Sequence, residues 1–317
     1  MKTIEKFWET ESVGIKESPG QDVEEFFNIN VSCARNRYEV NLPWKEERPT
    51  DHYNLSYNRL KSLQRRLIKE PELLREYDQI IKDQLQEGII EKVVEPGTDH
   101  LYNEGVHYMP HHGVVRKDKQ ITKLRIVYDG SATPGNGELS INDCLQPGPN
   151  FIPKLFDILV KFRCYPVALT ADIEKAFLTI CVNEADRDML RFLWFEEPPS
   201  LNSEITHFRF TRLVFGLRPS PAILGSTIVH HLDSYKDVHP ELVKQIEDSL
   251  YVDDLVTGAE DDAKAFDVYQ TSKKVMAAGS FNLRKWHSNS PKLLEKINGM
   301  EIESKIEHDD NVSKVIR

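Results

Sequence analysis

Two adjacent carboxylates lie inside a run of strand-forming residues. Asp253 and Asp254 belong to the segment SLYVDDLVTG, residues 249–258. Like charges side by side repel each other, and apolar flanking residues reduce the screening that water provides. Taken alone, the segment predicts a β-hairpin with a polar turn, because Asp is common in turns. A second carboxylate-bearing segment is needed before it indicates a cation site.

A third carboxylate ends an alternating segment earlier in the chain. In YPVALTADIEKAFLTICV, residues 165–182, Val167, Leu169 and Ala171 share one face at the period of a strand, and Asp172 lies on the other. Such a strand beside the hairpin would bring three carboxylates together. Carboxylates, water and phosphate oxygens are the ligands that Mg²⁺ prefers. A carboxylate-bridged metal pair activates a hydroxyl for attack and stabilises a leaving pyrophosphate.

Elements around these carboxylates follow from capping residues and periodicity. SPAILGSTIVHHLDSY, residues 220–235, predicts a helix with Ser220 as N-cap and Pro221 in the first helical position. DDAKAFDVYQTSKKVMAAG predicts a second helix that ends at Gly279, and FNLRKWHSN, residues 281–289, predicts a strand. Strands and helices therefore alternate around the candidate site.

The first half of the chain predicts helices followed by a basic hairpin. Residues 53–87 show helical periodicity interrupted by Pro71, and Gly88 suits a helix C-cap. RLKSLQRRLIKE, residues 59–70, is either a solvated helix face or a nucleic-acid contact. HYMPHHGVVRKDKQITKLRIVYDGS predicts a hairpin with VRKDK at its tip, and VSCARNRYEVNLPWK, residues 31–45, predicts one strand closed by its proline.

Composition is that of a globular chain with an acidic balance. The 317 residues are 39% hydrophobic and 29% charged, and the net charge is 41 − 51 = −10. This balance alone argues against nucleic-acid binding, although local basic clusters count for more. Four scattered cysteines without a CxxC pair disfavour a zinc site and a disulfide framework. No apolar run is long enough to span a membrane, and MKTIEKFWETES lacks a signal-peptide core, so we expect an intracellular, non-secreted protein.

The ordered motifs resemble the reverse transcriptase region of a retroelement polyprotein, most closely the BEL/Pao class of LTR retrotransposons. ADIEKAF, residues 171–177, resembles the first catalytic motif. This resemblance makes Asp172 catalytic and Phe177 the aromatic residue that excludes a ribose 2′-OH. The third motif is YVDD, which supplies Asp253 and Asp254, and FNLRKWHSN resembles the stretch after it, with Lys285 as an acid near the pyrophosphate. By resemblance, Asp253 is the firmer metal ligand and Asp254 the weaker one.

Two further segments carry the resemblance. TRLVFGLRPSPAIL, residues 211–224, resembles the second motif, with Phe215 and Gly216 where many retroviral enzymes have Gln-Gly at the dNTP contact. KLRIVYDGSA, residues 123–132, resembles the returning strand of the fingers hairpin. It makes Arg125 a triphosphate contact, with Lys117 or Lys119 as its partner.

The resemblance implies an α/β (α+β) polymerase of the right-hand type, with an antiparallel palm sheet backed by helices and the thumb largely missing. An upstream segment would span residues 1–45, and residues 291–317 would begin the thumb or connection. Fingers would span residues 46–146 and 181–214, and the palm 147–180 and 215–290.

Implied activity is RNA-directed DNA synthesis from dNTPs on a primer and an RNA or DNA template. Mg²⁺ or Mn²⁺ would bind Asp172, Asp253 and Asp254. Further partners would be the protease, RNase H and integrase of the same polyprotein, in a cytoplasmic particle or the nucleus and without a membrane. The rival interpretation is a truncated or degenerate remnant that only binds nucleic acid or other proteins. A carboxylate-based phosphohydrolase would leave the LRPSP helix start and the basic hairpin unexplained.

Overall fold

The computed structural model describes residues 31–34, 37–93, 105–115, 124–135, 137–196 and 203–302. The chain divides into two compact units. One comprises Met1–Asn150 and Phe177–Leu224, and the other comprises Phe151–Ala176 and Gly225–Arg317. We call them unit 1 and unit 2. The predicted helix near Trp8, the turn ESPGQD, and Lys117 and Lys119 of the hairpin tip lie outside the described residues.

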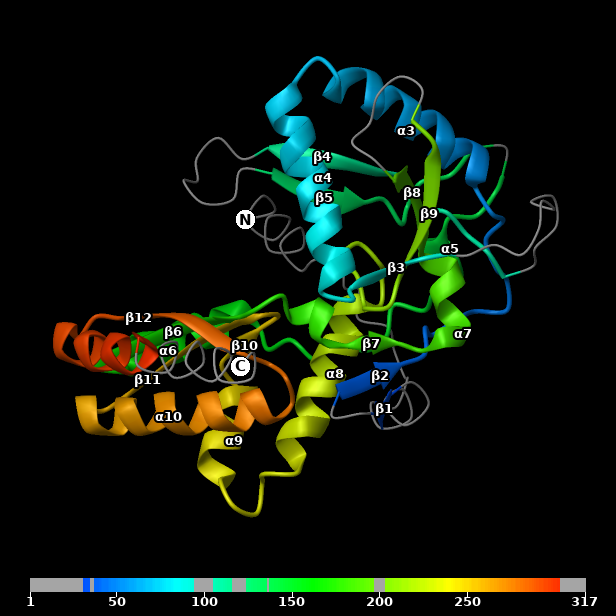
Figure 1. Cartoon of the computed structure of the whole chain (residues 1–317). Helices are drawn as coiled ribbons and strands as arrows, with labels where there is room; N and C mark the ends of the chain where they lie inside the picture. Colours follow the sequence, from blue (N-terminus) through cyan, green and yellow to red (C-terminus); the bar gives the residue numbers. More distant parts are fainter. Residues whose placement is uncertain are drawn as a thin grey trace, which may run out of the picture. The chain divides into compact units, whose positions relative to one another are not determined.

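Unit 2 is built on a four-stranded sheet in the order β10-β11-β6-β12, with antiparallel neighbours throughout. Its strands are β6 (Val167–Ile173), β10 (Leu250–Tyr251), β11 (Asp254–Ala259) and β12 (Leu283–Ser288). Helices α6 (Leu155–Cys164), α9 (Pro240–Glu247) and α10 (Asp262–Ala278) pack against it, as Figure 1 shows for α10. Buried side chains alternate along β6, as the sequence predicts.

Local capping explains where α10 begins and ends. The Asp261 side chain accepts a hydrogen bond from the Lys264 amide, and Gly279 is the C-cap residue. A carboxylate at the N-cap satisfies an amide that has no partner within the helix. Tyr269, Val275 and Met276 on this helix are buried. The helix therefore covers the sheet with its apolar side.

Unit 1 holds the remaining sheets of the described residues. β3 (Ile90–Lys92), β9 (Ile205–Phe210) and β8 (Arg191–Phe195) form one sheet, and β4 (His111–Val115) pairs with β5 (Leu124–Tyr128). A third sheet joins β1 (Val31–Ala34), β2 (Arg37–Val40) and β7 (Cys181–Val182). The helices are α3 (Tyr53–Leu67), α4 (Pro71–Gln86), α5 (Ile141–Cys144) and α7 (Glu184–Arg187), with 3-10 turns at Ala176–Thr179 and Asp188–Leu190.

Aromatic residues fill the core of unit 1. Phe192 and Trp194 of β8 and Phe208 and Phe210 of β9 are almost completely buried. β8 is buried on both faces, because α3 packs against the sheet that β8 shares with β9. Large aromatic side chains bury much apolar surface each, which stabilises this core.

Two local predictions are corrected by the structure. Residues 31–45 form two strands, with Val31 opposite Val40, and not one. Ser220 is the first residue of helix α8 (Ser220–Asp233), and not its N-cap as predicted. Its hydroxyl donates to the carbonyl oxygen of Val214 at 2.7 Å and so points back into the preceding turn. The mixed α+β class, the break between α3 and α4 at Pro71, and the β4–β5 hairpin are confirmed. The fingers and palm boundaries stay a prediction.

Candidate functional site

Asp172 and Asp254 are brought together by the pairing of β6 with β11. Their Cα atoms are direct partners in this antiparallel register. Directly opposite residues share one face of a sheet, with Cβ atoms roughly 4.5–5.5 Å apart. Asp172 lies on the less buried face of β6, as its position after Ala171 predicts. The sheet therefore presents two of the three predicted carboxylates side by side.

Asp253 lies in a two-residue connection between β10 and β11. Tyr251 pairs with Asp254, so Val252 and Asp253 form the turn. The Asp253 carbonyl oxygen accepts a hydrogen bond from the Ile173 amide at 2.8 Å, which ties the turn to the end of β6. Val252 has a φ of 58°, a left-handed value that is strained for a β-branched residue. Strain of this kind clusters at functional sites.

Two cations face the carboxylate of Asp172. Lys285 Nζ lies 3.0 Å from Asp172 Oδ2, and Arg284 Nε lies 3.5 Å from the same oxygen. Arg284 also donates to Glu174, which accepts a second hydrogen bond from Asn282 Nδ2 at 3.0 Å. The predicted site residues Asp172, Asp254 and Lys285 thus meet at one end of the unit 2 sheet.

The environment of Asp254 disfavours its charged form. Burial of the carboxyl group raises its pKa, the negative charge of Asp172 raises it further, and Lys285 opposes both effects. On the neighbouring strand, Asp172 Oδ1 is buried and has no hydrogen-bond partner among the described residues. An additional cation would satisfy this oxygen and offset the repulsion between the two carboxylates.

A divalent cation fits this donor set as a pair of ligands and not as a closed cage. Within the described ranges, no group of three or more His, Cys, Asp or Glu side chains is placed to hold a metal ion. Mg²⁺ usually binds proteins through one or two carboxylates and completes its shell with water and phosphate oxygens. Asp172 and Asp254 supply that minimum set.

Three predicted nucleotide contacts of unit 1, Phe177, Phe215 and Gly216, lie close together. Phe177 and Phe215 have ring centroids 5.7 Å apart in an edge-to-face arrangement, and 66% of Phe215 is exposed. Gly216 has a φ of 104°, and a Cβ atom there would lie 2.8 Å from the carbonyl oxygen of Tyr128. Phe215 and Gly216 line a pocket of about 390 Å³ with Arg218. Only glycine fits this turn without strain.

Sequence reasoning missed Asn142, which holds the same turn in place. Its Nδ2 donates to the carbonyl oxygen of Gly216 and to Ser131 Oγ, both at 2.9 Å, and its Oδ1 accepts from the Arg218 amide at 2.8 Å. The capping box of Ser140 and Asp143 is a sequence signal for the short helix α5, but it does not indicate these contacts.

Arg125 lies on β5 opposite Val114, and it is exposed. Its side chain makes no hydrogen bond or ion pair with the described residues. Its predicted partners Lys117 and Lys119 lie outside those residues. The triphosphate clamp therefore stays a prediction.

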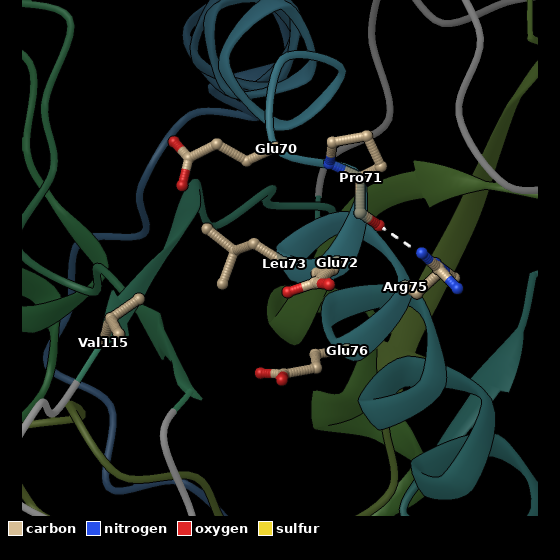
Figure 2. A pocket seen from close by; sticks show the side chains of 7 residues that line it. All are labelled: Glu70, Pro71, Glu72, Leu73, Arg75, Glu76 and Val115. Carbon is tan, nitrogen blue, oxygen red and sulfur yellow. Dashed lines mark hydrogen bonds between the residues drawn. The ribbon is translucent and has the colours of Figure 1, made fainter.

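A separate pocket of unit 1, shown in Figure 2, does not contain any predicted site residue. Its volume is about 610 Å³, and Glu70, Glu72 and Glu76 line it together with Arg75. Arg75 Nε donates to the carbonyl oxygen of Pro71 at 3.3 Å. Three acidic side chains repel phosphate groups, so this pocket does not fit a nucleotide.

No described helix is long and apolar enough to cross a membrane.

Comparisons with known proteins give structural similarities only. No protein-family model and no curated protein matches the chain. The foamy viral protease-reverse transcriptase dRH in complex with double-stranded DNA is 20% identical, with a TM-score of 0.47, over 65% of this chain and 30% of that chain. The foamy viral protease-reverse transcriptase in complex with an RNA/DNA hybrid is 18% identical, with a TM-score of 0.47, over 66% and 23%. The chain spans less than a third of the length of either viral protein.

Proposed function

We propose that the chain is the reverse transcriptase domain of a BEL/Pao-class LTR retrotransposon and transfers nucleotides from dNTPs to a primer 3′-OH. The observation that carries this proposal is the cross-strand pair of Asp172 and Asp254, with Asp253 in the adjoining turn. The motif resemblance of ADIEKAF, FGLRPSP and YVDD supports it. In this proposal unit 2 corresponds to most of the palm.

Asp172, Asp253 and Asp254 would hold Mg²⁺ or Mn²⁺. The bound cation would neutralise charge on the phosphates and favour ionisation of the primer hydroxyl. Lys285, whose ammonium lies beside Asp172, would donate a proton or a hydrogen bond toward the departing pyrophosphate. Catalysis in this class rests on positioning and on charge stabilisation more than on covalent chemistry.

Residues of unit 1 would bind the nucleotide. Phe177 would pack against the sugar and exclude a 2′-OH, and its ring already contacts that of Phe215. Arg125, with Lys117 or Lys119, would contact the triphosphate. Binding of template and primer would depend on phosphate contacts and weaken steeply with salt. Further partners would be the protease, RNase H and integrase of the same polyprotein.

Primer extension tests the proposal directly. Purified wild-type chain with a primed RNA template, dNTPs and Mg²⁺ should extend the primer, and Asp253→Asn should abolish extension. Asp237→Asn is the matched control, because Asp237 is an exposed carboxylate with no hydrogen bond or ion pair among the described residues. Extension that survives Asp253→Asn would exclude the proposed active site.

The second candidate is a nucleic-acid-binding module without catalysis, and the surface of α3 favours it. Arg65 and Arg66 in its last turn and Lys69 just beyond it are exposed, and none has a carboxylate partner among the described residues. Such a face suits phosphate contacts. Three results together would favour the module. Asp253→Asn would bind primed template as wild type does, changing the three basic residues to Gln would weaken this binding, and the wild-type chain would extend no primer.

A further inference from the structure

The ammonium group of Lys285 lies beside the carboxylate of Asp172. Its Nζ is 3.0 Å from Asp172 Oδ2, and this is the only hydrogen bond or ion pair of the Lys285 side chain within the described part of the chain. The Lys285 side chain is 64% exposed, whereas that of Asp172 is 23% exposed. The lysine therefore reaches from solvent onto a largely covered carboxylate.

An irregularity in β12 directs Lys285 to this position. Arg284 pairs with Asp172 and His287 pairs with Thr170, so Lys285 and Trp286 together lie opposite Ala171. Two residues opposite one define a β-bulge, which redirects side chains. Trp286 is buried and Lys285 is exposed, so the bulge leaves Arg284 and Lys285 in succession beside the carboxylate.

The backbone at this bulge would suit glycine better than lysine. Lys285 has a φ of 51°, in the left-handed region where glycine is unstrained. A strained conformation that persists is grounds for a functional hypothesis about the residue that adopts it. The backbone conformation at position 285 therefore does not account for a lysine there, and the contacts of its side chain have to.

The two cations beside Asp172 differ in how firmly they are held. Arg284 is anchored through Glu174, which Asn282 also holds. Lys285 has the one contact with Asp172 and a flexible, solvent-exposed stem. A lysine ammonium is a compact point charge without a fixed hydrogen-bonding fork. Lys285 is thus the cation of the pair with fewer contacts and greater exposure.

We propose that Lys285 acts as the resident counter-cation of Asp172, and that a divalent cation binds Asp172 and Asp254 by displacing its ammonium. This inference rests on the proposed function only in naming a divalent metal ion as the cation that binds. Displacement moves the ammonium away from Asp172 and makes it available to an anionic ligand. Binding of the cation and of a phosphate-bearing ligand would then favour each other, because binding couplings are reciprocal.

Titration with Mn²⁺ followed by electron paramagnetic resonance of the free ion tests the displacement without any polymerase assay. Lys285→Met should bind Mn²⁺ about tenfold more tightly than wild type, because a unit charge that competes for the same oxygen is gone. Lys285→Arg should stay near the wild-type affinity, because the charge is kept. Lys264→Met is the matched control, since Lys264 pairs with Glu260 on the exposed surface of the same unit.

Two further variants localise the effect and separate it from folding. Adding Asp172→Asn to Lys285→Met should remove the gain in Mn²⁺ affinity. Lys285→Gly should show the gain together with unchanged or higher thermal stability, because glycine fits the left-handed backbone. The proposal is overturned if Lys285→Met binds Mn²⁺ with an affinity within about twofold of wild type, or if neither protein binds Mn²⁺. It is also overturned if the gain in Mn²⁺ affinity persists when Asp172→Asn is added. A chain that binds Mn²⁺ as expected but extends no primer would refute the polymerase assignment alone.

Discussion

Asp172 and Asp254 are direct cross-strand partners, although they lie 82 positions apart in the sequence (254 − 172). Their like charges repel across β6 and β11, and Lys285 and Arg284 offset part of that repulsion. Neighbouring carboxylates held in this way are costly for the folded state and useful for binding a cation. The arrangement leads to predictions that separate stability from activity.

Asp254→Asn should stabilise the protein at pH 7 and abolish primer extension. Burial and Asp172 raise the pKa of Asp254, so its ionised form is disfavoured in the folded state. Ionised Asp254 therefore destabilises the folded state at pH values above its raised pKa. This destabilisation vanishes below the pKa of Asp in the unfolded chain, near 3.8. We expect a gain of less than about 1 kcal/mol, because the carboxyl group is only partly buried and solvent screens its charge. Urea unfolding at pH 7 and pH 3.5 checks this, with Asp267→Asn as control. An equal gain at both pH values would contradict the electrostatic explanation.

Val252→Gly should raise the free energy of unfolding by about 1 kcal/mol, because glycine adopts a positive φ without strain. The same substitution at Val256, inside β11, should destabilise the protein. Chemical denaturation of both variants measures the difference. A loss of stability at both positions would show that Val252 contributes more through packing than it costs through strain.

Gly216→Ala should destabilise unit 1 by about 2–4 kcal/mol, because strain and a steric clash add at this position. The added Cβ atom would meet the carbonyl oxygen of Tyr128 at 2.8 Å. Gly135 is the matched control: its φ is 91°, and nothing lies within 4 Å of the added atom. Gly135→Ala should therefore cost only the backbone strain, about 1 kcal/mol. Similar melting temperatures for the two variants would rule out the clash.

Asn142→Asp should destabilise the turn at Phe215 and Gly216 by about 1–3 kcal/mol, because the carboxylate cannot donate to the Gly216 carbonyl oxygen. Since the turn carries Phe215, KM for dNTP should rise more than kcat falls. Thermal unfolding and steady-state primer extension measure the two effects. Asn58→Asp, on the exposed surface of α3, should change neither. A fall in kcat with an unchanged KM would contradict a role in nucleotide positioning.

Acid should destabilise unit 1 between pH 6.5 and 4. Burial lowers the pKa of His107 and of His111 from 6.5 to about 4. The unfolded chain therefore takes up these protons before the folded chain does, and stability falls as pH falls. At pH 5 each histidine costs about 2 kcal/mol. Urea unfolding at pH 7 and pH 5 measures this loss. His111→Gln should reduce the loss, whereas the same change at the exposed neighbour His112 should leave it unchanged.

The sequence by itself determined the elements whose signals are local. The alternation along β6 predicted that Asp172 lies on the less buried face, and Gly279 predicted where α10 ends. The polar pair Asp253 and Asp254 between strand-forming residues predicted a hairpin, and the structure confirms it with the turn one residue earlier, at Val252 and Asp253. Periodicity and capping depend on residues within a few positions of each other, so these predictions need no knowledge of the tertiary structure.

Only the tertiary structure decided how those elements meet. The register of β11 against β6 sets Asp254 opposite Asp172, and a slip of one residue would turn Asp254 to the other face. The bulge that brings Lys285 to Asp172 also buries Trp286, and Asn142 reaches a carbonyl group 74 residues away. Pairings between distant segments are fixed by burial and by hydrogen bonds across the fold, which no local pattern encodes.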